Sequence, residues 1–211
     1  MPIPMKLCRA ALMALICGVT VPAVLQSTAA EPPRKRPPLH GQAVPDNPED
    51  RVKLLDNLYA LLATAENEQA AGEIAAAIER LWIASSGSDT VAVLMERALK
   101  AANEKKLDMA LQFLDSIVDL APDYAEGWNR RAYVFYMQHD MVRALGDLRR
   151  TLALDPSHFK ALEGLGQMLR EIGEKKAALA AYKRLVEVHP LASGAQKTLD
   201  ELERDVSGQG I

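Results

Sequence analysis

Three stretches of this sequence end in the same way: residues 117–122 read IVDLAP, residues 151–156 read TLALDP and residues 185–190 read LVEVHP. Their prolines, Pro122, Pro156 and Pro190, are therefore equally spaced, with a period of 34, and each follows an apolar run. Proline cannot continue a helical hydrogen-bond ladder, so each of the three indicates the end of a helix. A fixed period of this length predicts a repeated structural unit.

Small residues keep the same period in two further sets, and large residues keep it in a third. The small sets are Ala98, Ala132, Gly166 and Ala110, Ala144, Ala178, and the large set is Leu114, Leu148, Tyr182. We expect the small residues to let two helices approach closely while the large ones fill the space between successive helix pairs. One such pair cannot bury its apolar face alone, so the pairs must stack on one another. The predicted fold class is all-α.

This periodic pattern resembles the tetratricopeptide repeat (TPR), whose family pattern is W-x2-L-G-x2-Y, then A-x3-F, then P. The middle unit matches it best, with Trp128, Ala132, Phe135, Ala144 and Pro156. The resemblance implies a TPR-type α-solenoid with three repeats, at residues 91–124, 125–158 and 159–192. It departs from the family in the usual leucine column, which holds Arg97 and Arg131.

The segments on both sides of the repeats also have helical spacing. Leucines from Leu54 to Leu62 and the apolar residues from Ile74 to Trp82 predict a helical hairpin over residues 49–87. We expect this hairpin to cover the open N-terminal end of the array. Residues 193–211 are expected to form a C-terminal capping helix and a frayed tail.

Residues 1–30 have the organisation of a secretory signal peptide: basic Lys6 and Arg9, an apolar stretch, and small residues before Glu31. An uncleaved membrane anchor is the alternative. Residues 31–48 hold six of the chain's twelve prolines and predict an extended linker. Its basic cluster at 34–36 is either a solvated segment or a contact with an anionic membrane surface.

Removal of the signal peptide would leave a mildly acidic chain without thiols. The 25 basic residues less Lys6 and Arg9 leave 23 against 28 acidic residues, a net charge of −5. Nucleic-acid binding proteins need a basic face, so we expect no nucleic-acid partner. Cys8 and Cys17 both lie in the signal peptide, which excludes disulfides, thiol catalysis and cysteine-bound metal from the mature chain.

The layout also resembles small exported TPR proteins of alphaproteobacteria, on the phrases SGSDTVAVLM at 86–95 and PDYAEGWNRRAYVFY at 122–136. This resemblance implies a periplasmic protein with a role in assembly or integrity of the cell envelope.

No constellation of residues predicts catalysis. The four histidines, His40, His139, His158 and His189, form no pair with zinc-ligand spacing, and we expect those outside the linker to lie in surface turns. The sequence has no nucleophile elbow and no phosphate-binding glycine loop. We therefore expect no catalytic residues, cofactor, metal or small-molecule substrate.

Arrays of this family bind partners in a concave groove lined by the first helix of each repeat. Carried onto this chain, the resemblance implies a protein or peptide partner and a mixed groove with an aromatic centre. The implied groove residues are Met95, Leu99, Asn129, Arg130, Tyr133, Tyr136, Met137, Lys160, Glu163, Gln167 and Arg170, together with Glu96, Asn103, Glu126 and Glu171.

Some members of the family bind the C-terminal carboxylate of cytosolic chaperones with a Lys/Asn/Arg clamp. This chain has Met95, Leu99, Arg130 and Gly164 at four of those positions and matches only at Lys160, so we expect no clamp. Arg97 and Arg131 either reach carboxylates from packed stems or form a basic row for an acidic partner.

Three functions follow from these observations. The first is a periplasmic adaptor that binds a partner through the groove. The second is an envelope protein held at the membrane surface by an uncleaved N-terminal helix and the basic linker. The third, an enzyme, lacks the acid and base pair that it would need.

Overall fold

The computed structural model describes residues 44–208. These residues form nine helices and no strand, which confirms the predicted all-α fold for this part of the chain. The predicted signal peptide and most of the proline-rich linker lie outside the described residues. The helices are α1 (Pro48–Ala63), α2 (Glu68–Ala84), α3 (Asp89–Asn103), α4 (Leu107–Leu120), α5 (Ala125–Met137), α6 (Met141–Leu154), α7 (Phe159–Glu171), α8 (Lys175–Val188) and α9 (Ala195–Ser207). None of them is both long and apolar enough to span a bilayer.

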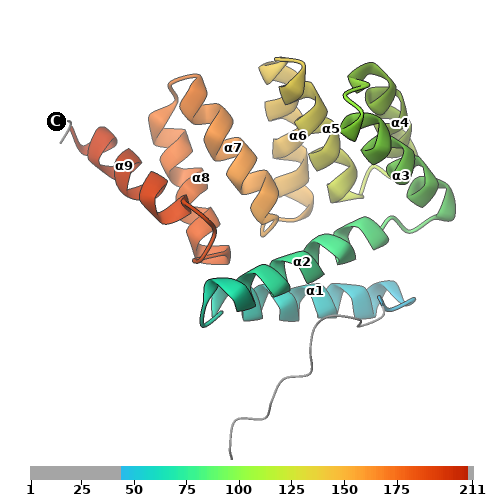
Figure 1. Ribbon diagram of the computed structural model, residues 1–211, viewed down its shortest axis with the longest axis horizontal. Helices are drawn as coiled ribbons and strands as arrows, with labels where there is room; N and C mark the ends of the chain where they lie inside the picture. Colours follow the sequence, from blue (N-terminus) through green and yellow to red (C-terminus); the bar gives the residue numbers. More distant parts are fainter. Residues whose placement is uncertain (1–43, 209–211) are drawn as a thin grey trace, which may run out of the picture. The chain divides into compact units, whose positions relative to one another are not determined.

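The helices α3 to α8 form three consecutive hairpins whose boundaries keep the sequence period (Figure 1). The second helices begin at Leu107, Met141 and Lys175 and end at Leu120, Leu154 and Val188, so both ends repeat with the spacing of the prolines. Each proline of the periodic set lies two residues beyond the last helical residue. This offset has a physical cause, because a proline ring also disfavours helical conformation in the residue that precedes it.

Each hairpin is closed by contacts between small residues and a large neighbour. The six small residues of the two periodic sets are all buried. A Cβ atom on Gly166 would lie 2.7 Å from Cε2 of Tyr182, which is closer than real side chains pack. The third repeat therefore combines the smallest residue with the largest partner, Tyr182, where the first two combine alanine with leucine.

Arg131 joins the first two repeats through acidic side chains. Its Nε and Nη2 atoms donate to the two oxygens of Asp147, at 2.7 and 2.9 Å, and its Nη1 atom donates to Asp115 in α4 at 2.9 Å. The guanidinium also lies over the ring of Trp128, 4.8 Å from its centre. Arg131 thus reaches carboxylates from a packed stem, whereas Arg97 is exposed.

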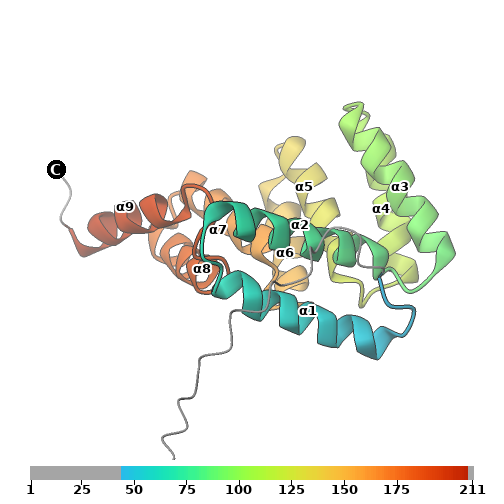
Figure 2. The same ribbon diagram turned by 60° about the horizontal axis from the view of Figure 1, so that its bottom comes forward.

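The N-terminal hairpin does not lie where the sequence suggested. Instead of covering the free end of the first repeat, α1 and α2 run side by side across one end of the repeat hairpins and contact α5 and α8 (Figures 1 and 2). The apolar side chains of Leu58, Leu62 and Ile78 enter the same core as Phe159 and Leu185 of the third repeat. The expectation of an N-terminal cap was therefore wrong.

At the other end of the array, α9 packs on α8. Leu199 and Leu202 are buried on its inner face, and its outer edge pairs with α8 through Lys175–Asp205 at 2.8 Å and Lys183–Glu203 at 3.0 Å. This helix closes the C-terminal face of the third repeat.

The turn within each repeat hairpin contains one residue in the left-handed region of backbone conformation. These residues are Lys105, His139 and Gly173, with φ of 58°, 61° and 84°, and they keep the period of the prolines. Only glycine adopts this conformation without steric cost, so the first two repeats keep strained residues where the third has the favoured one.

Relief of this strain should stabilise the protein. We expect His139→Gly, in an exposed turn, to raise the free energy of unfolding by roughly 0.5–1 kcal/mol. Gly173→Ala is the matched opposite change and should lower it by about 1 kcal/mol. Urea unfolding followed by circular dichroism measures both. A destabilised His139→Gly would show that the imidazole makes a contribution larger than the backbone strain.

Candidate functional site

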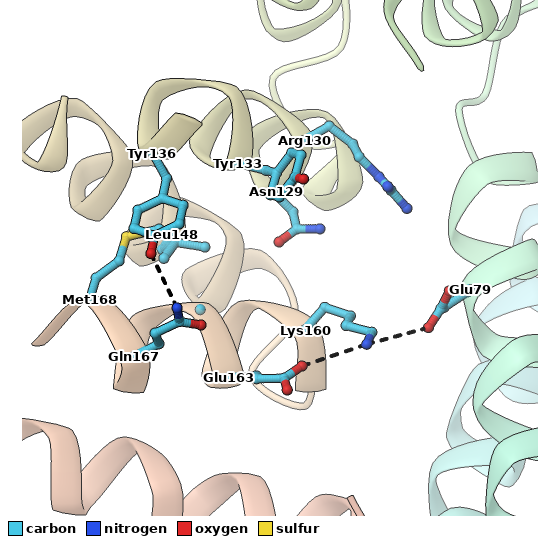
Figure 3. A pocket seen from close by; sticks show the side chains of 11 residues that line it. Glu79, Asn129, Arg130, Tyr133, Tyr136, Leu148, Lys160, Glu163, Gln167 and Met168 are labelled. Atoms are coloured by element: carbon cyan, nitrogen blue, oxygen red, sulfur yellow. Dashed lines mark hydrogen bonds and ion pairs between the residues drawn. The ribbon is translucent and has the colours of Figure 1, made fainter. Parts of the chain in front are cut away.

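A groove with a volume of about 390 Å³ lies between α5 and α7 (Figure 3). Tyr133 and Tyr136 of α5 form one wall and Gln167 and Met168 of α7 the other, above a floor that includes Leu148 of α6. The full lining is Glu79, Asn129, Arg130, Tyr133, Tyr136, Leu148, Lys160, Glu163, Gly164, Gln167 and Met168. The groove thus lies between the first helices of the second and third repeats.

Seven of the implied groove residues line this single groove: Asn129, Arg130, Tyr133, Tyr136, Lys160, Glu163 and Gln167. Leu99 lines a smaller hollow of about 40 Å³ between α3 and α5, which shares Arg130 and Tyr133 with the groove. Met137 and Arg170 line neither. Met95 is 1% exposed and belongs to the core of the first repeat, so its assignment to the groove surface was wrong.

Four lining residues lie outside the set that the repeat positions implied. Leu148 and Met168 were outside the set because family positions alone do not show how far a neighbouring side chain reaches. Gly164 lines the groove because it has no side chain, and a Cβ atom there would meet only Leu148, at 3.6 Å. Glu79 comes from α2, and only the position of the N-terminal hairpin across the repeats brings it here.

Polar groups surround the groove on both sides. Tyr136 donates to Glu171 at 2.7 Å and accepts from Gln167 at 3.1 Å, and the hydrogen bond to Glu171 raises the pKa of the tyrosine. At the end next to α2, the Lys160 ammonium lies 3.5 Å from Glu163 and 4.0 Å from Glu79. These pairs are loose and half-exposed, so a ligand can replace them at small cost.

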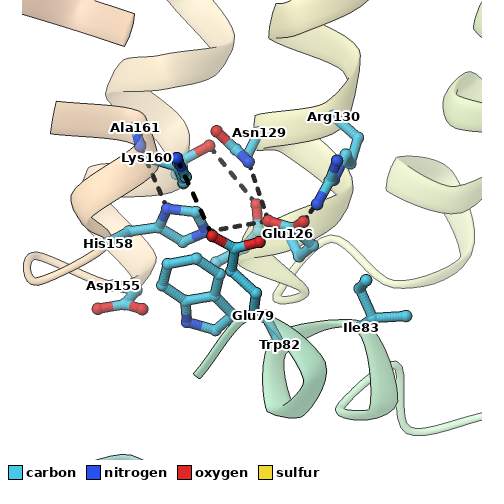
Figure 4. A network of polar contacts seen from close by, with 12 residues as sticks. Glu79, Trp82, Ile83, Glu126, Asn129, Arg130, Asp155, His158, Lys160 and Ala161 are labelled. Atoms are coloured by element: carbon cyan, nitrogen blue, oxygen red, sulfur yellow. Dashed lines mark hydrogen bonds and ion pairs between the residues drawn. The ribbon is translucent and has the colours of Figure 1, made fainter. Parts of the chain in front are cut away.

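Behind the groove wall, a buried carboxylate organises the residues on the surface (Figure 4). Glu126 is 1% exposed and accepts from Nδ2 of Asn129 at 2.9 Å, from Nε of Arg130 and from Nε2 of His158 at 3.0 Å. Asn129 and Arg130 both line the groove, so Glu126 fixes the direction of two of its polar side chains. Glu126 itself was expected on the groove surface, and that expectation was wrong.

His158 is fully buried, which contradicts the expectation of a surface turn. Its ring stacks on Trp82 of α2, with centres 3.7 Å apart and planes 6° from parallel. Its Nδ1 atom accepts from the backbone N–H of Ala161 at 3.2 Å and caps α7. Because Nδ1 accepts, the ring donates to Glu126 through Nε2.

Glu126 is held in its charged form. Burial raises the pKa of this carboxyl, but the hydrogen bonds and charges of His158 and Arg130 outweigh burial and lower the pKa below its usual range. A carboxylate charge is therefore part of the core between α2, α5 and α7.

A second set of polar contacts attaches the N-terminal hairpin next to His158. The Tyr59 hydroxyl donates to Asp155 at 2.6 Å and accepts from Nε1 of Trp82 at 3.2 Å. Burial and the charge of Asp155 raise the pKa of Tyr59. Tyr124 donates to the carbonyl oxygen of Ile83 at 3.1 Å. The hairpin is thus bonded to the turns that end the first and second repeats.

His189 closes the same aromatic cluster from the third repeat. Its ring meets Phe159 edge to face at 5.4 Å, and Phe159 in turn packs on Trp82. Burial and the nearby charge of Lys160 lower the pKa of His189, while Glu163 opposes the shift. Among the described residues, no group of histidine, cysteine or carboxylate side chains has an arrangement that could hold a metal ion.

Removal of the buried carboxylate should cost much more than removal of a groove carboxylate. We expect Glu126→Ala to lower the free energy of unfolding by about 2–4 kcal/mol, because the buried Nε2–H of His158 loses its acceptor. Glu163→Ala is the control and should change it by less than about 0.5 kcal/mol. Urea unfolding compares the two. Equal effects would mean that the Glu126 contacts contribute no net stability.

The protein should lose stability between pH 7 and pH 5. The pKa of His189 is lower in the folded state than its ordinary value of 6.5, so the unfolded chain binds the proton more readily as the pH falls through that value. Stability that is present above pH 6.5 is therefore lost below it. His189→Gln should flatten the dependence of the urea midpoint on pH in this range. An unchanged slope in the variant would assign the loss to other groups.

Comparison with known proteins places these features in a family. A tetratricopeptide repeat model matches residues 129–195. A TPR repeat-containing protein of Rhizobium etli is 35% identical over 154 residues, which cover 73% of this chain and 75% of that protein. A DnaJ protein P58IPK homolog of Oryza sativa is 27% identical over 101 residues. These residues cover 47% of this chain and 21% of the Oryza protein.

Solved structures show the same fold. The first TPR of Spaghetti (RPAP3), bound to an HSP90 peptide, has a TM-score of 0.54 at 22% identity and covers 57% of this chain and 95% of its own. The TPR domain of Arabidopsis OM64 has a TM-score of 0.51 at 20% identity and covers 58% of this chain and 98% of its own. With the periodic helix boundaries, the family match and the Rhizobium relative, the chain belongs to the tetratricopeptide repeat family.

Proposed function

We propose that this protein is a non-catalytic scaffold that binds a segment of a partner protein in the groove between α5 and α7. The observation that carries the proposal is the groove itself: an apolar floor that includes Leu148, walls that present the buried Met168 and the exposed Tyr133, and loosely paired charges on the rim. Such a surface offers an apolar anchor site together with polar groups that set orientation.

Proteins with similar structures support this type of ligand. The RPAP3 domain named above is bound to the HSP90 peptide SRMEEVD, and the TPR2B domain of yeast Sti1 is found in a complex with Hsp70, at a TM-score of 0.50. The groove of the present chain differs from the carboxylate clamp expected for such peptides, since Met95, Leu99, Arg130 and Gly164 stand at four of the clamp positions in place of the residues that the clamp needs. We therefore infer a partner other than a chaperone C-terminus.

The shape of the groove indicates what its ligand carries. Gly164 leaves a gap beside Leu148, and the buried side chains that line the groove, Leu148 and Met168, are apolar. A large apolar side chain of the partner fits there, flanked by main chain or polar side chains that meet Asn129 and Gln167.

We further propose that the protein is exported and acts in the bacterial periplasm, in assembly or integrity of the envelope. The signal-peptide pattern of residues 1–30 and the absence of cysteine after Cys17 support this proposal. N-terminal sequencing of protein isolated from its own cells tests it. A mature chain that starts near Glu31 supports export, and an intact Met1 on membrane-bound protein would instead favour the uncleaved anchor.

The groove can be blocked without disturbance of the core. We expect Gly164→Leu to reduce partner binding at least tenfold, because the new side chain occupies the gap beside Leu148. Gly146→Leu is the matched control: this glycine is also helical, it lies on α6, and a Cβ atom there meets nothing within 4 Å. Arg130→Ala is a poor test, since it removes a donor from the buried Glu126.

The measurement is photocrosslinking in cells with p-benzoylphenylalanine in place of the exposed Tyr133, followed by mass spectrometry. The original chain and Gly146→Leu should give the same crosslinked partner, and Gly164→Leu should lose it while its circular-dichroism spectrum is retained. Equal crosslinking in all three would exclude the groove as the binding site.

A further inference from the structure

The first repeat has a face that no described residue covers, and the sequence period defines it. Three of the contacts that the second repeat makes with the first identify this face: a Cβ on Gly127 would lie 2.8 Å from Ile117, Nε1 of Trp128 donates to the carbonyl oxygen of Pro122 at 3.1 Å, and Arg150 donates to the same oxygen at 3.4 Å. The corresponding positions one period earlier are Val93, Leu94 and Ser116. These residues, with Leu120, are named the open face.

The open face is more apolar than a free end of a solenoid should be. Val93 is 47% exposed and Leu120 is 61% exposed beside the first turn of α3. Terminal repeats of soluble arrays normally present a polar outer face. Here the arginine that the second and third repeats have, Arg150 and Arg184, is replaced by Ser116. A face of this kind is typical of a protein contact.

The charges on α3 indicate which protein makes that contact. Asp89, Val93, Glu96 and Lys100 are spaced by four, three and four residues, so they lie along one exposed stripe of the helix, with Arg97 beside it. The stripe is acidic at its N-terminal end, apolar next to it, acidic again at Glu96 and basic at its C-terminal end. A second α3 in antiparallel orientation that places Asp89 against Lys100 of the other copy places Val93 against the stem of Glu96. The stripe is therefore complementary to itself.

Head-to-tail stacking of copies is excluded by two features. The helix α9 covers α8, which is the surface that the open face of the next copy would need. In addition, Val93 occupies the position at which stacked repeats have the small residues Gly127 and Ala161. A second copy can therefore bind only in a two-fold arrangement, in which the open face of one copy contacts the open face of the other.

We propose that the protein forms a symmetric dimer through the open face, with α3 of one copy antiparallel to α3 of the other. Because α3 has 15 residues and a length of about 22 Å, the contact is at the small end of specific interfaces. We expect a dissociation constant on the order of micromolar. The groove between α5 and α7 remains accessible in this dimer, so the dimer is independent of the proposed function.

Charge exchange tests the antiparallel pairing. Sedimentation velocity of protein purified from cells that express the full chain should show a dimer at about 100 µM, in the micromolar regime expected for a small interface. Asp89→Lys and Lys100→Asp should each weaken self-association at least tenfold, because each creates two pairs of like charge. A one-to-one mixture of the two variants should dimerise again, since each lysine introduced at position 89 then meets an aspartate introduced at position 100.

Two variants that replace an exposed valine by glutamate complete the test. Val93→Glu on the open face should give a monomer, whereas Val142→Glu, 83% exposed on α6, should leave the dimer unchanged. Thermal unfolding shows that the variants are folded. A monomer at all concentrations, a dimer that survives Val93→Glu, or a mixture of charge variants that stays monomeric would each overturn the proposal.

Discussion

The position of the groove depends on one buried contact, the hydrogen bond between Glu126 and His158. Glu126 lies in the first turn of α5 and His158 caps α7, so this contact fixes the relative placement of the two helices that form the groove walls. The same carboxylate holds Asn129 and Arg130 on the surface, and the same imidazole carries Trp82 of the N-terminal hairpin on its face. A buried charge is costly unless its hydrogen bonds are satisfied, which makes the three elements interdependent.

The repeat period predicted most of the fold because it follows from close packing. Positions such as Ala132 and Ala144 can tolerate only small side chains, so their spacing is visible in the sequence without knowledge of the neighbours. The groove residues Tyr133, Tyr136 and Gln167 followed from the same period, since position in a repeat determines the face of the helix.

Contacts outside the period could not be predicted in this way. The position of α1 and α2 depends on Trp82 meeting His158, two residues of unrelated sequence segments. One signal was nevertheless present: Tyr124 and His158 are one period apart, both are buried, and both contact the N-terminal hairpin. His158 has the same position in its repeat as the buried Tyr124, and this shared position indicated a core residue. The absence of zinc-ligand spacing gave no information about the burial of His158.

The crossing of α1 and α2 also determines the elasticity of the array. A solenoid whose repeats touch only their neighbours bends and stretches like a spring. In this protein the N-terminal hairpin contacts α5 and α8, its Trp82 packs on His158 and Phe159 at the start of α7, and its Tyr59 donates to Asp155 after α6, so the joint between the second and third repeats is braced. The joint between the first and second repeats is held as well, by the hydrogen bond from Tyr124 to Ile83 of the hairpin and by the contact of Arg131 with Asp115. The groove therefore lies at a braced joint, and a ligand meets a groove whose width is set before it arrives.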